Sequence, residues 1–287
     1  MEHRALSAPF APAPLPRSRH QRIDGAARIA FGTRGISDLY QRAPCRFLFP
    51  DTEAGGFPQA VSITTSGGLT GGDRVALDIA VEPGACGTVT TQAAEKLYRV
   101  LPEDPDIRID TRIEVASGGR CEWLAQEAIL FDRSRARRRL HAHLAADAKF
   151  LAVETIVFGR LAMGEAFAQG LIHDEWRIWR DGALIWADAL HIDGDFPALW
   201  SAPFRLGGAR ALATLVYAGQ DAAEHLELAR TLAPAPSGGA TCLDRLLILR
   251  FLHADPRTLR DQVVRAAEAL RAVTLGLPER LPAVWYC

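Results

Sequence analysis

The side chains best suited to chemistry in this chain are carboxylates that lie next to apolar segments. Glu127 and Asp132 stand on either side of a short apolar run, and Glu165 ends a segment that contains Gly159 and Gly164. Two such acids can serve as general acid and general base, or they can bind a divalent cation through oxygen. Acids in apolar surroundings are also commonly paired with basic side chains, and arginine is abundant here. The local pattern fits both a chemical site and structural ion pairs, and it favours the ion pairs, because buried acids are usually paired.

A second candidate is a glycine-rich stretch, Ser66–Asp73, which contains Gly67, Gly68, Gly71 and Gly72. Closely spaced glycines allow sharp turns and positive φ, so such a loop can cradle a phosphate. A phosphate-binding loop of the Walker type would also need a lysine and a following helix, whereas an alternating strand pattern begins at Arg74. The stretch therefore favours a corner between strands, with Asp73 as its hydrogen-bonded anchor.

Histidine and cysteine are weaker candidates for metal binding. His141 and His143 lie two positions apart on a predicted strand, so their side chains share one face and could hold one ion. No third ligand is close in the sequence, and a solvated strand face explains the pair without a metal. Cys287 is either a soft ligand or part of a frayed terminus. The five cysteines form no C-x-x-C pair, which argues against disulfides or a zinc site and favours a reducing cytoplasm.

Composition narrows the classes of function. The 287 residues carry a formal net charge of −1, with both signs mixed along the chain, so we expect no nucleic-acid partner. There is no apolar run long enough for a membrane span and no signal peptide, so we expect a cytoplasmic protein without a membrane partner. Residues 1–22 are rich in proline and arginine and predict a flexible arm. Residues 23–287 are expected to form a single scaffold domain.

Strands must position most of these groups, because apolar and polar residues alternate over most of the chain. Gly and Pro separate the strand patterns, and no strand–helix–strand alternation occurs that would predict a nucleotide-binding sheet. Pro83-Gly84 suggests a turn, so Asp73–Gln92 reads as a hairpin, and Asp181-Gly182 is the strongest short hairpin signal.

Helical spacing occurs only in the last third of the chain. Asp221–Leu232 has such a pattern, and Asp255 precedes a longer one in which Pro256 suits the first helical position and Gly276 the end. The predicted fold is mostly β: a single large scaffold of many short strands with one or two C-terminal helices.

Four of these stretches occur in a fixed order: Ser66–Asp73, Thr90–Arg99, Gln126–Asp132 and Gly159–Glu165. Together they resemble the most recognisable segments of the UreD/UreH family of urease accessory proteins, and the resemblance extends from about Arg28 to the C-terminus. Its motif residues also include Gln92, Tyr98, Arg99 and Glu127. The chain departs from the family pattern at Thr70, near Glu95, where family members often have a threonine, and at Arg133, and in part at its last six residues, Pro282–Cys287.

The resemblance implies strands wound in a helical or layered arrangement and a protein that is not an enzyme. Such proteins bind the accessory protein UreF and, through it, the GTPase UreG, and they dock on apo-urease as chaperones of nickel insertion and metallocentre assembly. The resemblance therefore implies that no cofactor is tightly bound and that nickel only passes through the protein. The transit candidates are Asp132, Glu165 and Asp73, since isolated carboxylates bind Ni²⁺ weakly enough to release it.

A different class of function stays open beside this one. In a carboxylate-based metal-dependent hydrolase on a β scaffold, Asp132 and Glu165 would converge with His141 or His143 around a tightly held ion. This alternative requires those side chains to meet in the fold.

Overall fold

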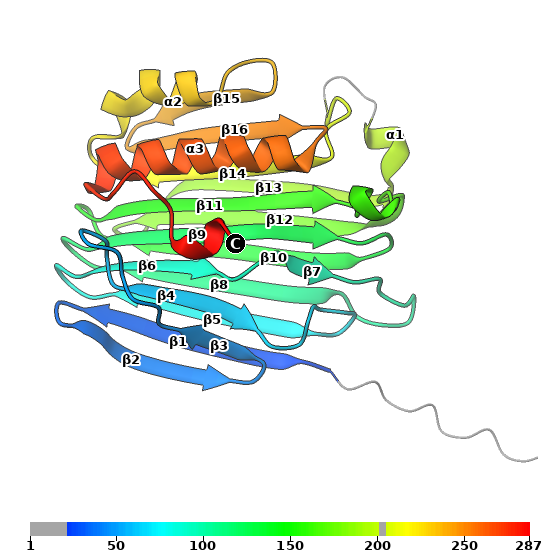
Figure 1. The fold of residues 1–287 in the computed structure, drawn as a ribbon, viewed down its shortest axis with the longest axis horizontal. Coiled ribbons are helices and arrows are strands. Elements are labelled where there is room, and N and C mark those ends of the chain that lie inside the picture. The colour runs from blue at the N-terminus through cyan, green and yellow to red at the C-terminus, as the bar shows by residue number, and fades with distance from the viewer. Residues whose placement is uncertain (1–21, 201–204) are drawn as a thin grey trace, which may run out of the picture.

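Two large β-sheets packed face to face make up most of the protein (Figure 1). The computed structural model describes residues 22–200 and 205–287. Sheet A has seven strands, in the order β13 (Ala183–Asp195), β12 (Gln169–Arg180), β10 (Arg135–Leu144), β8 (Ile107–Val115), β5 (Arg74–Val81), β1 (Asp24–Gly32) and β2 (Gly35–Arg42). Sheet B has nine strands, in the order β15 (Gly238–Leu243), β16 (Leu246–His253), β14 (Ala211–Ala218), β11 (Lys149–Phe158), β9 (Arg120–Leu130), β6 (Cys86–Thr91), β4 (Gln59–Thr64) and β3 (Cys45–Leu48), with β7 (Glu95–Leu97) beside the end of β9.

Consecutive strands from β4 to β12 alternate between the two sheets, apart from the short β7. Within each sheet these strands pair in parallel, for example β5 with β8 and β9 with β11. The chain therefore winds as a flattened parallel coil, and only the outer strands of each sheet are antiparallel. The predicted mostly β fold with a helical or layered arrangement is confirmed.

The predicted hairpin over Asp73–Gln92 is wrong. Its two strands exist as β5 and β6, but they lie in different sheets, and the turn at Pro83-Gly84 carries the chain from one sheet to the other. A short Gly-containing turn fits both geometries, so its sequence does not distinguish them. The second hairpin is confirmed: β12 and β13 are antiparallel across Asp181 and Gly182, whose positive φ values of 49° and 80° suit a tight turn.

Two apolar cores explain the burial patterns of the strands. The first lies between the sheets and receives every second side chain of sheet A, for example Ile29, Ile79 and Ile113. The second lies on the outer face of sheet B, where helix α3 (Pro256–Leu275) covers the strands. Strand β11 is therefore buried on both faces and reads as a nearly continuous apolar run.

Helix α3 begins and ends as its sequence predicts. The Asp255 carboxylate accepts hydrogen bonds from the N–H groups of Arg257 and Thr258, Pro256 occupies the first turn, and Gly276 ends the helix in the left-handed conformation. The other predicted helix is a 3-10 turn, Ala222–His225, followed by α2 (Leu226–Leu232). A short α1 (Phe196–Trp200) follows β13. In the described residues no helix combines the length and apolar character needed to cross a membrane.

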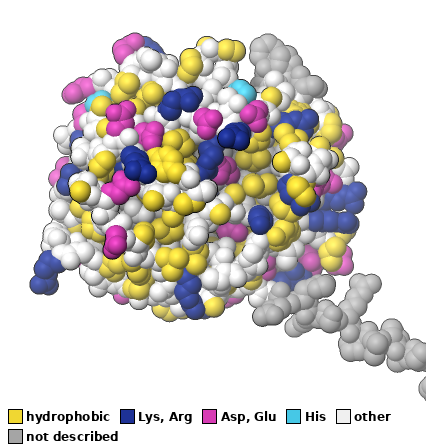
Figure 2. Space-filling view, in the orientation of Figure 1, with side chains coloured by type: hydrophobic (Ala, Val, Ile, Leu, Met, Phe, Trp, Pro, Cys, Tyr) yellow, Lys and Arg dark blue, Asp and Glu magenta, His cyan; other side chains and the backbone are white. Residues whose placement is uncertain are grey.

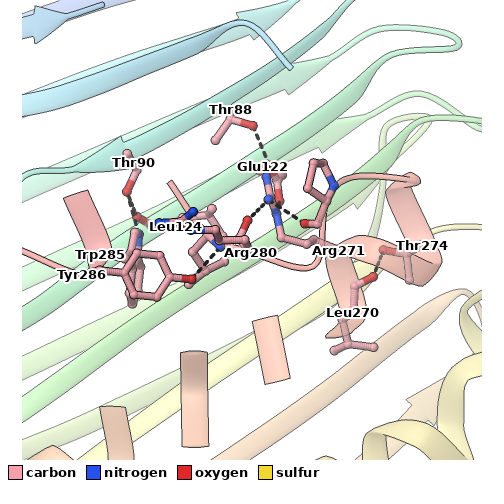
Figure 3. Close-up of polar contacts among 12 residues, drawn as sticks. Thr88, Thr90, Glu122, Leu124, Leu270, Arg271, Thr274, Arg280, Trp285 and Tyr286 are labelled. Carbon is pink, nitrogen blue, oxygen red and sulfur yellow. Dashed lines mark hydrogen bonds and ion pairs between the residues drawn. The ribbon is translucent and has the colours of Figure 1, made fainter. Parts of the chain in front are cut away.

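A buried ion pair fixes α3 to sheet B (Figure 3). Arg271 donates two hydrogen bonds, of 2.9 and 2.8 Å, to the fully buried carboxylate of Glu122 on β9. The same guanidinium donates to the carbonyl oxygens of Pro278 and Arg280, in the segment that follows the helix. One side chain thus joins a strand, a helix and the C-terminal segment.

A second set of contacts, at a β-bulge in β9, joins sheet B to α3 and to the C-terminal segment. The pairing of β9 with β11 shifts between Leu124 and Glu127, so the adjacent side chains of Gln126 and Glu127 both reach Arg260 on α3. Arg260 also donates to the Trp285 carbonyl oxygen at 2.7 Å. The motif residue Glu127 is therefore an ion-pair partner in this fold.

The predicted N-terminal arm, residues 1–22, lies outside the described residues except for Arg22. Its guanidinium donates to the Gly71 carbonyl oxygen and forms an ion pair with Asp104 at 2.5 Å. The beginning of the described chain is thus tied to the glycine-rich corner.

Candidate functional site

The four motif stretches, far apart in sequence, meet at one end of the two-sheet structure. The Tyr98 hydroxyl donates to the Gly67 carbonyl oxygen at 2.8 Å, and its ring packs edge-on against Phe131, with centroids 4.8 Å apart. The Arg160 guanidinium lies over the Phe131 ring, 4.1 Å from its centroid. A continuous chain of contacts therefore joins all four stretches.

Close backbone packing explains the glycines of the first stretch. At Gly68, where φ is 141°, an added Cβ would lie 2.4 Å from the Tyr98 ring and 2.9 Å from the Lys96 carbonyl oxygen. Asp73 is almost fully buried and accepts hydrogen bonds from the N–H groups of Ile23 and Thr70, at 2.8 and 2.7 Å. This geometry is that of a structural anchor at a corner.

The structure brings Asp132 and Glu165 together, and both carboxylates are engaged. Glu165 accepts a hydrogen bond of 2.7 Å from the Asp132 N–H through one oxygen and pairs with Arg160 through the other. One Asp132 oxygen accepts from the N–H groups of Ala168 and Gln169, at 2.8 and 3.1 Å. The two acids thus hold the loop after β9 against the loop after β11.

Gly159→Ala is expected to lower the free energy of unfolding by about 2–3 kcal/mol, because φ is 84° and a Cβ would lie 2.6 Å from the Glu165 carbonyl oxygen. Gly164→Ala is the matched control in the same loop. There φ is 71°, but a Cβ would meet no atom within 4 Å, so a loss of about 1 kcal/mol is expected. Urea denaturation measures both, and equal losses would contradict the packing argument.

A cavity of about 240 Å³ lies between the sheets next to this end. It adjoins an interruption of sheet B, where the pairing of β6 with β9 stops at Thr90 and that of β7 begins at Glu95. Gly67, Gly68, Glu95 and Gln126 line it together with residues of both sheets, so three of the four motif stretches form part of its wall.

The buried charges of Arg138 and Glu154 also line this cavity. Arg138 on β10 pairs with Glu154 on β11 at 2.8 Å and with Asp174 on β12 at 3.3 Å, and all three side chains are about nine-tenths buried or more. Trp123 donates to the other Glu154 oxygen at 3.1 Å. Burial raises the pKa of Glu154 to about 7, although Arg138 opposes this effect, and burial also raises the pKa of Asp174.

Glu95 carries the remaining carboxylate of the cavity wall. It accepts a hydrogen bond of 3.0 Å from the Thr64 hydroxyl, and burial raises its pKa, with Thr64 and Arg138 acting in the opposite direction. A backbone hydrogen bond with Lys96 also lowers its pKa, and among the described residues Glu95 forms no ion pair within 4 Å, whereas Glu154 pairs with Arg138. Glu95 is therefore the cavity carboxylate with the most freedom to bind a ligand.

Sequence reasoning missed Glu95, Arg138 and Glu154 as site residues, although two of them leave a signal. Arg138 stands in register with Leu140 and Ala142 on the apolar face of its strand, and Glu154 interrupts the apolar run of β11. A charged residue in an inward-facing register is buried and must find a partner.

The histidines do not join the acids. His141 and His143 project from the outer face of sheet A, as predicted: His141 pairs with Glu175 at 2.8 Å, and His143 stacks on Trp179 with centroids 4.4 Å apart. Within residues 22–200 and 205–287 no three His, Cys, Asp or Glu side chains are grouped so as to hold a metal ion. The convergence that the hydrolase alternative requires is thus not found there. Cys287 is a free, exposed thiol.

Comparison with known proteins identifies the family. Residues 23–286 match the sequence model of the UreD urease accessory proteins. The chain belongs to the UreD family. It is 43% identical over 275 residues to the urease accessory protein UreD of Rhizobium leguminosarum bv. trifolii (strain WSM2304), which covers 93% of this chain and 97% of that protein. It is 39% identical over 283 residues to the urease accessory protein UreD of Magnetococcus marinus (strain ATCC BAA-1437 / JCM 17883 / MC-1). That match covers 95% of this chain and 97% of the relative.

UreD membership confirms the resemblance drawn from the four stretches. In this UreD protein those stretches form a contact network at one end of the scaffold, and that network borders the cavity. The candidate site of this family member therefore consists of the end of the two-sheet structure where the four stretches meet, together with the adjoining cavity.

Proposed function

We propose that this protein is a non-catalytic scaffold of urease maturation. In this proposal it assembles with UreF-type and UreG-type accessory proteins on apo-urease in the cytoplasm and passes nickel towards the urease metallocentre. Its relatives are named urease accessory proteins, which supports the association with urease. The observation that carries the nickel step is the cavity between the sheets, whose wall includes the carboxylates of Glu95 and Glu154.

The donor set of the cavity suits transport of Ni²⁺ better than storage. Carboxylate and hydroxyl oxygens from Glu95 and Thr64 are hard ligands, whereas tight nickel sites use imidazole or thiolate. The Arg138 guanidinium would repel a divalent cation and offset the attraction of Glu154. Nickel would therefore be held briefly and released.

Glu95→Gln is expected to reduce the nickel content of activated urease severalfold while leaving complex formation intact, because a neutral amide binds Ni²⁺ more weakly than a carboxylate. Co-expression with the urease subunits and accessory proteins, followed by metal analysis of the purified urease, measures the effect. Glu103→Gln, at an exposed loop position, is the control. A normal nickel content of urease activated with the Glu95 variant would show that nickel does not depend on the cavity for its passage.

A role in nickel transit remains a prediction for Asp132, Glu165 and Asp73. Nickel would have to compete there with hydrogen bonds that already occupy the carboxylate oxygens. The double variant Asp132→Ala, Glu165→Ala tests the first two in the same assay. A lower nickel content of urease with intact complex assembly would mean that Asp132 and Glu165 act in nickel transfer. Loss of assembly would mean that they hold their loops in place.

A further inference from the structure

Five neighbouring strands of sheet A carry a basic side chain at the same register on its outer face. Arg74 on β5 pairs in register with Arg108 on β8, and Arg108 pairs with Arg137 on β10. His173 on β12 and His191 on β13 continue the series. Residues that pair directly in this way point to the same face, and neighbouring strands lie about 4.8 Å apart. We call these five side chains the basic row.

The positive charge of the row is not cancelled by its own surroundings. Arg74 and Arg108 are exposed, and neither forms an ion pair with another residue of the described part of the chain. Arg137 does pair with Asp106, at 2.8 Å, but Asp106 is shared with Arg135. Two guanidinium groups therefore divide one carboxylate, and the row keeps an excess of positive charge.

The acids that border the row pair with basic side chains of other registers. Glu175 also reaches His173, at 3.8 Å, so the excess charge lies on the arginines. Residues 1–21 and 201–204, which lie outside the described part, contain a single acid, Glu2. The pairs of the bordering acids are Asp24 with Arg42, Asp110 with Arg139, and Glu175 with His141 and Arg177.

The row differs from the charge pattern of the rest of the surface. At the next register the same strands carry Asp110, Arg139 and Glu175, which alternate in sign. The face of the molecule that carries α3 also mixes acidic and basic side chains (Figure 2). Like charges directly opposite each other on paired strands are destabilising, so the row does not contribute to the stability of the sheet. A bound anionic group would remove this repulsion.

We propose that the basic row binds an extended acidic segment of a partner protein. Four strand spacings of about 4.8 Å give the row a length of roughly 19 Å, which about six extended residues span. Carboxylates match guanidinium groups in both charge and geometry. A nucleic acid fits less well, because the excess charge is confined to one register of a chain whose net charge is −1.

The row lies beside the candidate site. Arg74 directly follows Asp73, and the Arg108 N–H donates to the Asp73 carbonyl oxygen at 2.9 Å, so the row starts at the glycine-rich corner. An acidic segment bound there would lie next to the end where the four motif stretches meet. The inference rests on the charges of sheet A and does not require the proposed role in nickel transfer.

The test measures binding of a fluorescein-labelled hexaglutamate peptide to the full chain by fluorescence anisotropy, at low and at moderate salt. The double variant Arg74→Gln, Arg108→Gln should bind the peptide about tenfold more weakly than wild type, and wild-type binding should weaken as salt increases.

The matched control is the double variant Arg28→Gln, Arg112→Gln. It changes the net charge by the same amount on the same face of sheet A, but Arg28 pairs with Asp38 and Arg112 with Glu114. Its affinity for the peptide should therefore stay within about twofold of wild type.

Melting temperatures show whether the variants fold. The exchanged side chains of Arg74 and Arg108 are exposed and repel each other, so that double variant should melt at or above the wild-type temperature. Three outcomes would overturn the inference. Wild type might fail to bind hexaglutamate at low salt, or both double variants could lose affinity equally, which would reduce the effect to net charge. Tighter binding of a six-nucleotide oligothymidine than of the peptide would assign the row to a nucleic acid instead.

Discussion

Arg271→Ala is expected to lower the free energy of unfolding by about 3–5 kcal/mol. The substitution leaves the carboxylate of Glu122, which is fully buried, without its ion-pair partner, so that its remaining side-chain contact is the 2.5 Å hydrogen bond from Thr88. It also removes the donor to the Pro278 and Arg280 carbonyl oxygens, which fixes the C-terminal segment to α3. Urea denaturation followed by circular dichroism measures the loss.

Arg230→Ala provides the matched control. Arg230 lies on a helix as Arg271 does, but its pair with Glu227, within α2, is exposed, so the change should cost less than about 1 kcal/mol. The double variant Glu122→Leu, Arg271→Met removes both buried charges and should recover much of the stability lost by Arg271→Ala. A small loss for Arg271→Ala, similar to that of Arg230→Ala, would show that water or local rearrangement solvates Glu122.

Glu154→Gln is expected to change how stability depends on pH. Burial raises the pKa of Glu154 from 4.5 to about 7, so the folded protein binds this proton more tightly than the unfolded chain does. The carboxyl group therefore contributes less stability as the pH rises from about 4.5 to 7. Between pH 5 and pH 8 the unfolding free energy of Glu154→Gln should improve relative to wild type by on the order of 3 kcal/mol.

Denaturation of both proteins at several pH values provides the measurement. Asp174 has a raised pKa in the same cluster and contributes with the same sign, so the pH dependence should be weaker in the variant but not absent. Glu103→Gln is the exposed control and should follow wild type throughout. A constant difference between Glu154→Gln and wild type over this range would mean that Glu154 is ionised throughout it in the folded protein.

Local sequence patterns predicted the elements well, because strands and helices here follow the alternation and capping of their own residues. Asp255 and Gly276 mark the ends of α3, and Asp181-Gly182 forms the turn that its residue types require. The partner of each strand could not be predicted in this way. The turn at Pro83-Gly84 crosses between sheets, and the pairing of β5 with β8 depends on contacts far apart in sequence.

The candidate site was predicted in part. The sequence identified the four motif stretches but not that they meet in the fold, and Asp73 accepts the kind of backbone hydrogen bonds expected of an anchor at the corner. The residues that line the cavity could not be predicted, because they depend on how the two sheets face one another and on the interruption of sheet B between β6 and β7. The partners of Asp132 and Glu165 are largely backbone N–H groups of other loops, which no side-chain pattern records.

A parallel coil could in principle grow without limit, because each turn leaves backbone N–H and C=O groups on which another strand can pair. In this protein the first and last turns of the coil carry antiparallel strands: β2 and β3 at one end, and β13 with β14–β16 at the other. These strands act as end caps. They occupy the sites where further turns, or the coil of another molecule, would add, and so they restrict a potentially fibrous architecture to one finite particle.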